Sequence, residues 1–238
     1  MKSLWTFGCS YTEGYTETSK TFREYKSYCG DKFPKTWPEI LADKLELELK
    51  NRGEGASGNH QIFQEFCKHS NEFSQNDIII IGWTFLERYR IAKDDQTWIK
   101  LGSGKINEQI PISEECHESL VVNRTLKPYI DEIYNYQKLI DRFCESLSIN
   151  VYYWTMINEL IYDQPRDILN NRKYLINDLI KDQYDNVFTV SKKYGGYNIF
   201  EETNELINDF HQGGTGHEVQ ANLFYNHIVE NNRKWTSL

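Results

Sequence analysis

A serine near the start of the chain and a histidine near its end are the residues best suited to chemistry. Ser10 stands two residues after Gly8, where the apolar run of residues 4–7 stops. His211 lies in "NDFHQGG", two residues after Asp209. A serine hydroxyl, an imidazole that takes its proton and a carboxylate that orients the imidazole can together perform nucleophilic acyl transfer. Each stretch alone also fits an ordinary polar turn, so the surrounding elements decide whether these residues can meet.

The other histidines and the cysteines predict neither a metal site nor a disulfide framework. His60 and His69 are too scattered for a metal-ligand pattern, and His217, at the start of the last predicted helix, is expected to cap or to pack. The cysteines are odd in number and widely spaced, which favours reduced and mostly buried thiols: Cys9, Cys29, Cys67, Cys116 and Cys144. We therefore expect no metal and no cofactor.

Strand-like and helix-like segments alternate along the chain. Unbroken apolar or β-branched runs predict strands, and apolar residues at helical spacing predict helices. The predicted strands cover residues 3–7, about 47–51, 77–82 and 150–155, and the predicted helices cover residues 37–50, 61–69, 128–147 and 218–231. Residues 85–127 are interpreted as an insertion with a loop or small hairpin, and "NVFTV" within 156–200 as a last or edge strand.

This alternation predicts an α/β fold, a three-layer α/β/α sandwich with a central parallel sheet. The chain has 238 residues and no Gly/Ser-rich or Pro-rich linker, so we expect one domain over 1–238. Ligands of such sheets bind beyond the carboxyl ends of the strands. Three small or polar clusters follow predicted strands there: Gly8-Cys9-Ser10, "GEGASGN" and Gly82-Trp83-Thr84.

The charge balance excludes some classes of partner. The formal net charge is −8 and the chain holds no basic block, which argues against binding to nucleic acid or to an anionic membrane surface. The first apolar run is too short for a signal peptide, and no run approaches the length of a membrane span. From these features we expect a cytoplasmic protein.

The clusters, taken together, resemble the SGNH (GDSL-like) hydrolases. "FGCSYT" resembles the first block of that family, "NRGEGASGN" the second, "IIIIGWT" the third and "DFHQGGTGHEVQA" the fifth, in family order. The resemblance implies the SGNH hydrolase fold, which is flavodoxin-like. It also implies that Ser10 is the nucleophile, His211 the general base and then acid, and Asp209 its partner.

The resemblance further implies an oxyanion hole and a substrate cleft. The backbone N–H of Ser10, a backbone N–H at Gly55 or Ala56, and Thr84 would hold the oxyanion, with Asn59 as a reserve donor. Tyr11, Trp83 and Arg88 are expected to line the cleft, and Arg88 could bind a carboxylate or, as the simpler alternative, form a surface ion pair.

This sequence departs from the family pattern at three positions. Cys9 replaces the aspartate before the serine, and Thr84 replaces an asparagine. The family pattern is most often Asp-x-x-His, and the residue three before His211 is Asn208, so Asn208 is the alternative to Asp209.

The predicted function is a serine esterase that cleaves acyl or acetyl esters of a small or glycan-linked substrate. Two alternatives stay open at this point. One is an acyltransferase that uses the same triad, and the other is a binding module of the same fold without catalysis.

Overall fold

The computed structural model describes residues 2–13, 35–86, 88–92, 98–101, 127–155 and 214–235. The statements below concern these residues. The proposed catalytic residues His211 and Asp209, the alternative Asn208, and the predicted "NVFTV" strand lie outside them.

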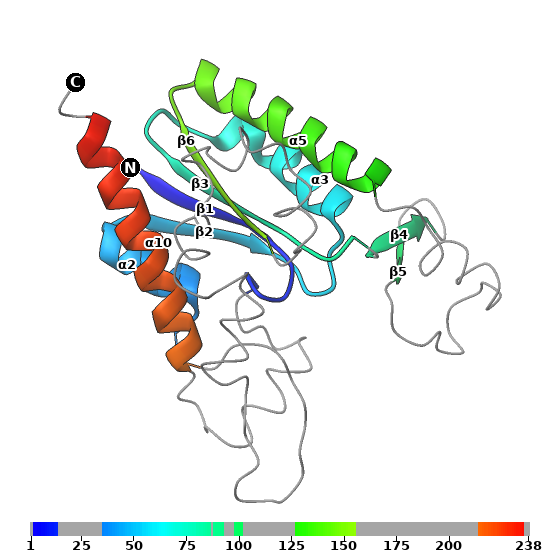
Figure 1. Ribbon diagram of the computed structural model, residues 1–238, viewed down its shortest axis with the longest axis horizontal. Coiled ribbons are helices and arrows are strands. Elements are labelled where there is room, and N and C mark those ends of the chain that lie inside the picture. The colour runs from blue at the N-terminus through cyan, green and yellow to red at the C-terminus, as the bar shows by residue number, and fades with distance from the viewer. Residues whose placement is uncertain are drawn as a thin grey trace, which may run out of the picture.

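A parallel sheet forms the centre of the molecule (Figure 1). Its strands are β1 (Ser3–Gly8), β2 (Glu48–Gly53), β3 (Ile78–Trp83) and β6 (Asn150–Thr155), in the order β2-β1-β3-β6. All three strand pairs are parallel. This order, in which the first strand lies between the second and the third, is the flavodoxin-like arrangement.

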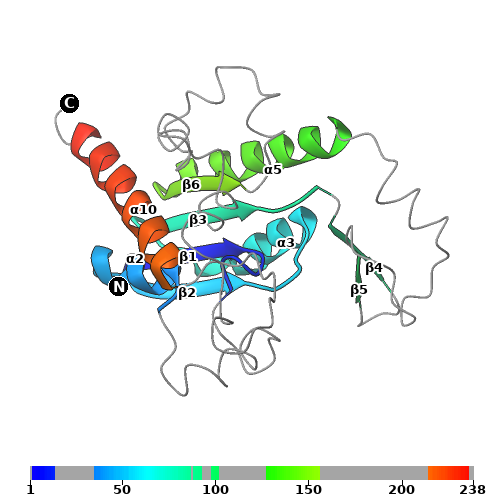
Figure 2. The same ribbon diagram turned by 60° about the horizontal axis from the view of Figure 1, so that its bottom comes forward.

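Helices cover both faces of the sheet (Figure 2). Helices α2 (Trp37–Leu45) and α10 (Gly214–Trp235) pack together on one face. Helices α3 (Asn59–His69) and α5 (Lys127–Ser146) cover the other, and the short 3₁₀ helix η1 (Ser70–Glu72) follows α3. The predicted three-layer α/β/α sandwich with a central parallel sheet is therefore confirmed.

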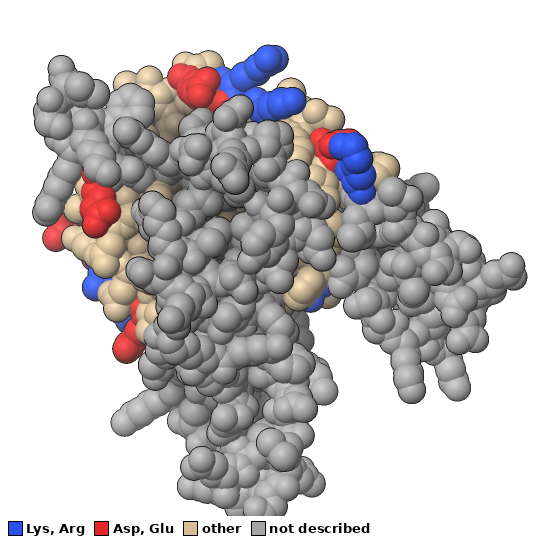
Figure 3. All heavy atoms as spheres, viewed as in Figure 1, with Lys and Arg blue, Asp and Glu red and all other residues tan. Residues whose placement is uncertain are grey.

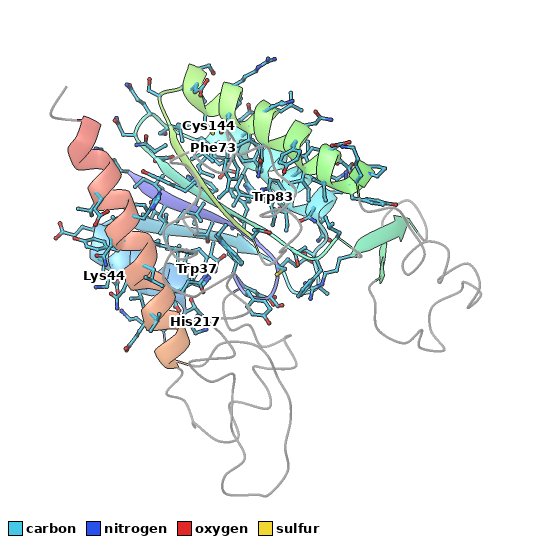
Figure 4. The ribbon with its side chains drawn as sticks, in the orientation of Figure 1. Trp37, Lys44, Phe73, Trp83, Cys144 and His217 are labelled. Atoms are coloured by element: carbon cyan, nitrogen blue, oxygen red, sulfur yellow. The ribbon has the colours of Figure 1, made fainter. Side chains whose placement is uncertain are left out.

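The sheet is buried on both sides because successive side chains of a strand point to opposite faces. On β1, Trp5 and Phe7 join the core beneath α3 and α5, whereas Leu4 joins the core beneath α2 and α10. Figure 4 shows the same division: Trp83, Phe73 and Cys144 lie on the side of α3 and α5, and Trp37 lies near α10. The unbroken apolar runs of β1 and β3 follow from this two-sided burial.

The element boundaries differ from the sequence prediction mainly at α2 and α10. Helix α2 ends at Leu45, and Glu46 takes a left-handed conformation with φ of 55°, so the predicted extent to residue 50 was wrong. The chain then enters β2, which is longer than predicted. The last helix begins at Gly214 and reaches Trp235, beyond the predicted 218–231 at both ends.

Part of the predicted insertion is described. Strands β4 (Tyr89–Ala92) and β5 (Trp98–Leu101) pair antiparallel in a separate two-stranded sheet. This antiparallel pair includes only the first two residues of the "KLGSGKINEQIP" stretch that suggested a loop or hairpin; the rest of that stretch lies outside the described residues.

Among the described residues, no helix combines the length and the apolarity needed to cross a bilayer. On the face seen in Figure 3, the acidic and basic side chains of the described residues are interspersed.

Candidate functional site

Three adjacent strands carry a glycine at or next to their last residue, and these glycines lie level with one another at the carboxyl edge of the sheet. Gly8 of β1 is in register with Gly53 of β2. Phe7 is paired with Ile81, which places Gly8 beside Gly82 of β3, and a Cβ built on Gly8 would lie 3.5 Å from the Gly82 carbonyl oxygen. The predicted clusters on the first three strands therefore meet at one edge.

Each proposed site residue follows one of these glycines at the same separation in the sequence. Ser10, Gly55 and Thr84 each stand two residues beyond a glycine near the end of their strand: Gly8 and Gly53 end β1 and β2, and Gly82 is the last but one residue of β3. The proposed nucleophile and two of the proposed oxyanion donors thus leave the sheet at the same level on neighbouring strands. The fold brings together residues that are far apart in the sequence.

Ser10 lies in a tight turn directly after β1. The N–H groups of Thr12 and Glu13 both donate to the carbonyl oxygen of Cys9, at 2.8 and 3.0 Å, which is one helical turn. Cys9 is buried and Ser10 is partly exposed, so the turn places the serine at the surface of the sheet edge.

The segment after β2 forms a second turn against the first. The Glu54 N–H donates to the Gly8 carbonyl at 3.0 Å and extends the β1–β2 ladder by one bond. The Ser57 N–H then donates to the Glu54 carbonyl at 3.1 Å, which closes a turn over Gly55 and Ala56. Ala56 has a positive φ of 59°, a conformation that glycine adopts more readily. Strained backbone of this kind is common at functional sites.

Asn51 joins the two turns and was not identified from the sequence. Its Oδ1 accepts hydrogen bonds from the Thr6 hydroxyl at 3.0 Å and from the Gly53 N–H at 2.9 Å. Its Nδ2 donates to the Thr12 carbonyl at 2.7 Å. One amide side chain therefore fixes the end of β2 to the turn that carries Ser10. An asparagine in an apparently polar edge strand gives no signal of this role before the pairing is known.

Thr84 is held on its main chain and on its side chain. The Thr84 N–H donates to Oδ1 of Asn59 at 2.8 Å, and Nδ2 of Asn59 donates back to the Thr84 carbonyl at 2.9 Å. The Thr84 hydroxyl accepts a hydrogen bond from the Arg88 guanidinium at 3.1 Å. Thr84 is fully buried. Thr84 is therefore tightly positioned.

Asn59 and Arg88 contact Thr84 in ways that the sequence did not predict. Asn59 is the first residue of α3, and one of its amide hydrogens is committed to the Thr84 carbonyl. Its part as a reserve oxyanion donor stays a prediction, whereas its contact with Thr84 indicates a positioning role. Arg88 was expected to bind substrate or to form a surface ion pair, and both stay predictions; its guanidinium donates to Thr84 and lies 5.1 Å from the centre of the Phe85 ring.

Two predicted cleft residues are buried. Trp83 is 0% exposed and belongs to the core beneath α3 and α5, where it stacks on Tyr136 and Tyr153. Tyr11 is 4% exposed, and its carbonyl accepts the Trp37 indole N–H at 2.7 Å. Thr84 is as inaccessible as Trp83, so burial does not by itself separate these two residues from the proposed donor, and their contact with substrate stays a prediction.

The carboxyl-terminal part of the predicted triad adjoins the described helix α10. This helix begins three residues after His211, and its buried His217 accepts the main-chain N–H of Trp37 at Nδ1, 3.1 Å away. The sequence predicted that His217 caps or packs at the start of the last helix; it is buried there, and its ring accepts a hydrogen bond from the first turn of another helix, α2 (Figure 4). This contact holds the start of α10 close to the start of α2.

Comparison of the sequence with protein-family models finds no match, and comparison with curated proteins finds none either. Among solved structures, the chain is similar to that of a protein from Desulfitobacterium hafniense DCB-2 assigned to the lipolytic G-D-S-L family. The two share 12% sequence identity, and the match covers 95% of this chain and 99% of that chain with a TM-score of 0.44.

Proposed function

We propose that this protein is a serine hydrolase of the SGNH type, an esterase that removes acyl or acetyl groups from a small or glycan-linked substrate. The observation that carries the proposal is the common level of Ser10, Gly55 and Thr84 at the ends of three adjacent parallel strands. A nucleophile and donors arranged along one sheet edge suit a carbonyl group that is attacked there.

The proposed reaction has two balanced steps. The Ser10 Oγ bonds to the carbonyl carbon while His211 takes the hydroxyl proton, and Asp209 orients the imidazole. The ester C–O bond then breaks, and the leaving alcohol carries away that proton. Water attacks the acyl-enzyme in the same way, gives its proton to His211, and releases the acid and a free Ser10 hydroxyl.

The oxyanion that forms in each step needs hydrogen-bond donors. The proposed donors are the Ser10 N–H, an N–H at Gly55 or Ala56, and the Thr84 hydroxyl. The positive φ of Ala56 and the turn around it are consistent with a backbone shaped to present N–H groups. Loss of one such donor typically reduces kcat by about 10²–10³-fold.

The first test is hydrolysis of p-nitrophenyl acetate by the wild type and by Ser10→Ala. We expect measurable turnover that Ser10→Ala abolishes, because no other group replaces the nucleophile. Ser70→Ala is the matched control, since Ser70 follows α3 and its hydroxyl bonds to the Cys67 carbonyl. Equal rates for wild type and Ser10→Ala would refute the catalytic assignment.

A second measurement locates the reactive serine directly. A fluorophosphonate should label the peptide that contains Ser10, and His211→Ala should slow that labelling because the serine loses its base. Asp209→Ala and Asn208→Ala separate the two candidate partners of His211: the variant with the slower labelling identifies the partner. Labelling at another serine, or none in the wild type, would favour a binding module.

A further inference from the structure

The buried hydroxyl of Thr84 acts as an acceptor toward Arg88. A guanidinium only donates hydrogen bonds, so Oγ1 of Thr84 must accept from Arg88. The hydroxyl hydrogen is therefore not used in that contact. Among the residues that the structure describes, no acceptor for it is found. This hydrogen can be donated to a ligand oxygen that reaches Oγ1, because a hydroxyl can accept one hydrogen bond and donate another.

Arg88 is itself fixed by the turn that it closes. Its main-chain N–H donates to the Phe85 carbonyl at 3.3 Å, and its guanidinium lies 5.1 Å from the centre of the Phe85 ring. The side chain is partly buried, so its charge is less screened than that of a fully exposed arginine. The positive charge therefore sits at a fixed place, 3.1 Å from the hydroxyl oxygen.

A cation that donates to a hydroxyl oxygen also strengthens that hydroxyl as a donor. Hydrogen bonds in a chain polarise one another, and the effect is larger where solvent is excluded. The Asn59 amide holds the main chain of Thr84 at the same time. The side chain of Thr84 is thereby oriented and polarised before any ligand arrives.

We infer that Arg88 is a positioning residue of the oxyanion hole, acting through the Thr84 hydroxyl. The threonine hydroxyl is shorter than the asparagine amide that the family pattern has at this position. Arg88 compensates by fixing the rotamer of Thr84 and by adding positive charge behind the donor. This inference rests on the proposed hydrolase function and adds a residue to it.

The test is a double-mutant cycle on Thr84→Val and Arg88→Met, with p-nitrophenyl acetate as a neutral substrate. We expect Thr84→Val to reduce kcat by about 10²-fold, as the loss of one oxyanion donor does. Arg88→Met should reduce kcat by roughly 10-fold, with KM within about 2-fold, because the donor remains but is no longer oriented. The double variant should be no slower than Thr84→Val, since both changes remove one interaction.

Two further variants separate positioning from a general effect of charge or folding. Arg88→Lys should restore part of the lost kcat, because a lysine keeps the charge and can donate to the hydroxyl. Arg142→Met removes an exposed arginine of α5 and should leave kcat unchanged. The unfolding midpoint of each variant shows whether it is folded under the assay conditions.

The outcomes are distinct. The positioning role would be overturned if the kcat losses of Thr84→Val and Arg88→Met multiplied in the double variant. It would also be overturned if Arg88→Met changed only KM. A KM effect found only with an anionic ester, such as mono-p-nitrophenyl succinate, would make Arg88 a substrate-binding residue instead. Turnover that is independent of Ser10 would refute the hydrolase itself, and this inference with it, whereas Ser10-dependent turnover unaffected by Arg88→Met would overturn this inference alone.

Discussion

Glycines stand at or next to the ends of the three strands at the proposed site because neighbouring atoms occupy the space of a side chain. A Cβ on Gly53 would lie 2.6 Å from the Glu13 nitrogen and 2.7 Å from the Thr12 carbonyl carbon. A Cβ on Gly82 would lie 2.2 Å from the Trp154 ring. The turn that carries Ser10 can therefore fold back over β2 only if residue 53 lacks a side chain.

Gly53 and Gly55 offer a matched pair of variants for this steric argument. We expect Gly53→Ala to lower the free energy of unfolding by about 1–3 kcal/mol, because the atoms that it meets are main-chain atoms of the turn. The nearest atom to a Cβ on Gly55 is Oε2 of Glu13, at 2.8 Å, the end of a flexible side chain that can move. Gly55→Ala should therefore cost less than about 1 kcal/mol.

Urea unfolding of the two variants measures the difference. Equal losses of stability in Gly53→Ala and Gly55→Ala would contradict the close packing of the turn against β2. Ser10-dependent hydrolysis by the same proteins adds a second measurement, since displacement of this turn moves the proposed nucleophile.

Side-chain contacts between distant elements explain why part of the site was not predictable. The order of the blocks located Ser10 and Thr84, because each follows an apolar run that is easy to recognise. The role of Asn51 depends on the pairing of β2 with β1, and the role of Asn59 depends on the approach of α3 to the end of β3. Neither of these contacts between elements can be recognised from the local sequence.

At the scale of elements, the strands that are buried on both faces were predicted well, and the edge strand was predicted less well. Strand β6 was predicted with its observed bounds, Asn150–Thr155, because most of its residues are buried. Strand β2 lies at an edge of the described sheet and its side chains are only partly buried, so its polar residues gave a weak signal. The leucines before it continue the helical spacing of α2, and only the left-handed Glu46 marks the end of that helix.

The packing of β6 against α10 makes stability sensitive to alkaline pH. Burial raises the pKa of Tyr152 to about 12, from an ordinary value near 10. The ring lies in the core beneath α2 and α10, 6.2 Å from the His227 ring. The folded protein holds the phenol proton to higher pH than the unfolded chain does. Its stabilising effect is therefore complete below about pH 10 and is lost as the pH rises towards 12.

The variant Tyr152→Phe isolates this effect. Between pH 10 and 12, we expect the wild type to lose about 2–3 kcal/mol more of its free energy of unfolding than Tyr152→Phe loses, because the variant has no phenol at this position to ionise. Urea unfolding at a series of pH values measures both slopes. Parallel slopes would show that the Tyr152 phenol is not held neutral by the fold.

At the scale of the whole molecule, the two cores share a single sheet. Ile133 of α5 packs on one face and Phe224 of α10 on the other, and both are essentially inaccessible to solvent. The two helices are separated by much of the sequence but bury the same four strands. We therefore predict that the chain unfolds as one domain, with neither face stable without the other.

The variants Ile133→Ala and Phe224→Ala test whether the chain unfolds as one domain. Large-to-small changes in a core cost about 2–5 kcal/mol for isoleucine and 3–5 kcal/mol for phenylalanine. If the chain is one cooperative unit, each variant shifts a single transition, and far-UV circular dichroism and tryptophan fluorescence give the same midpoint. The Trp83 and Trp154 rings lie in different cores, so fluorescence samples both faces. Separate transitions, or a variant that shifts the midpoint of only one probe, would divide the chain into two domains and exclude the single domain predicted from the sequence.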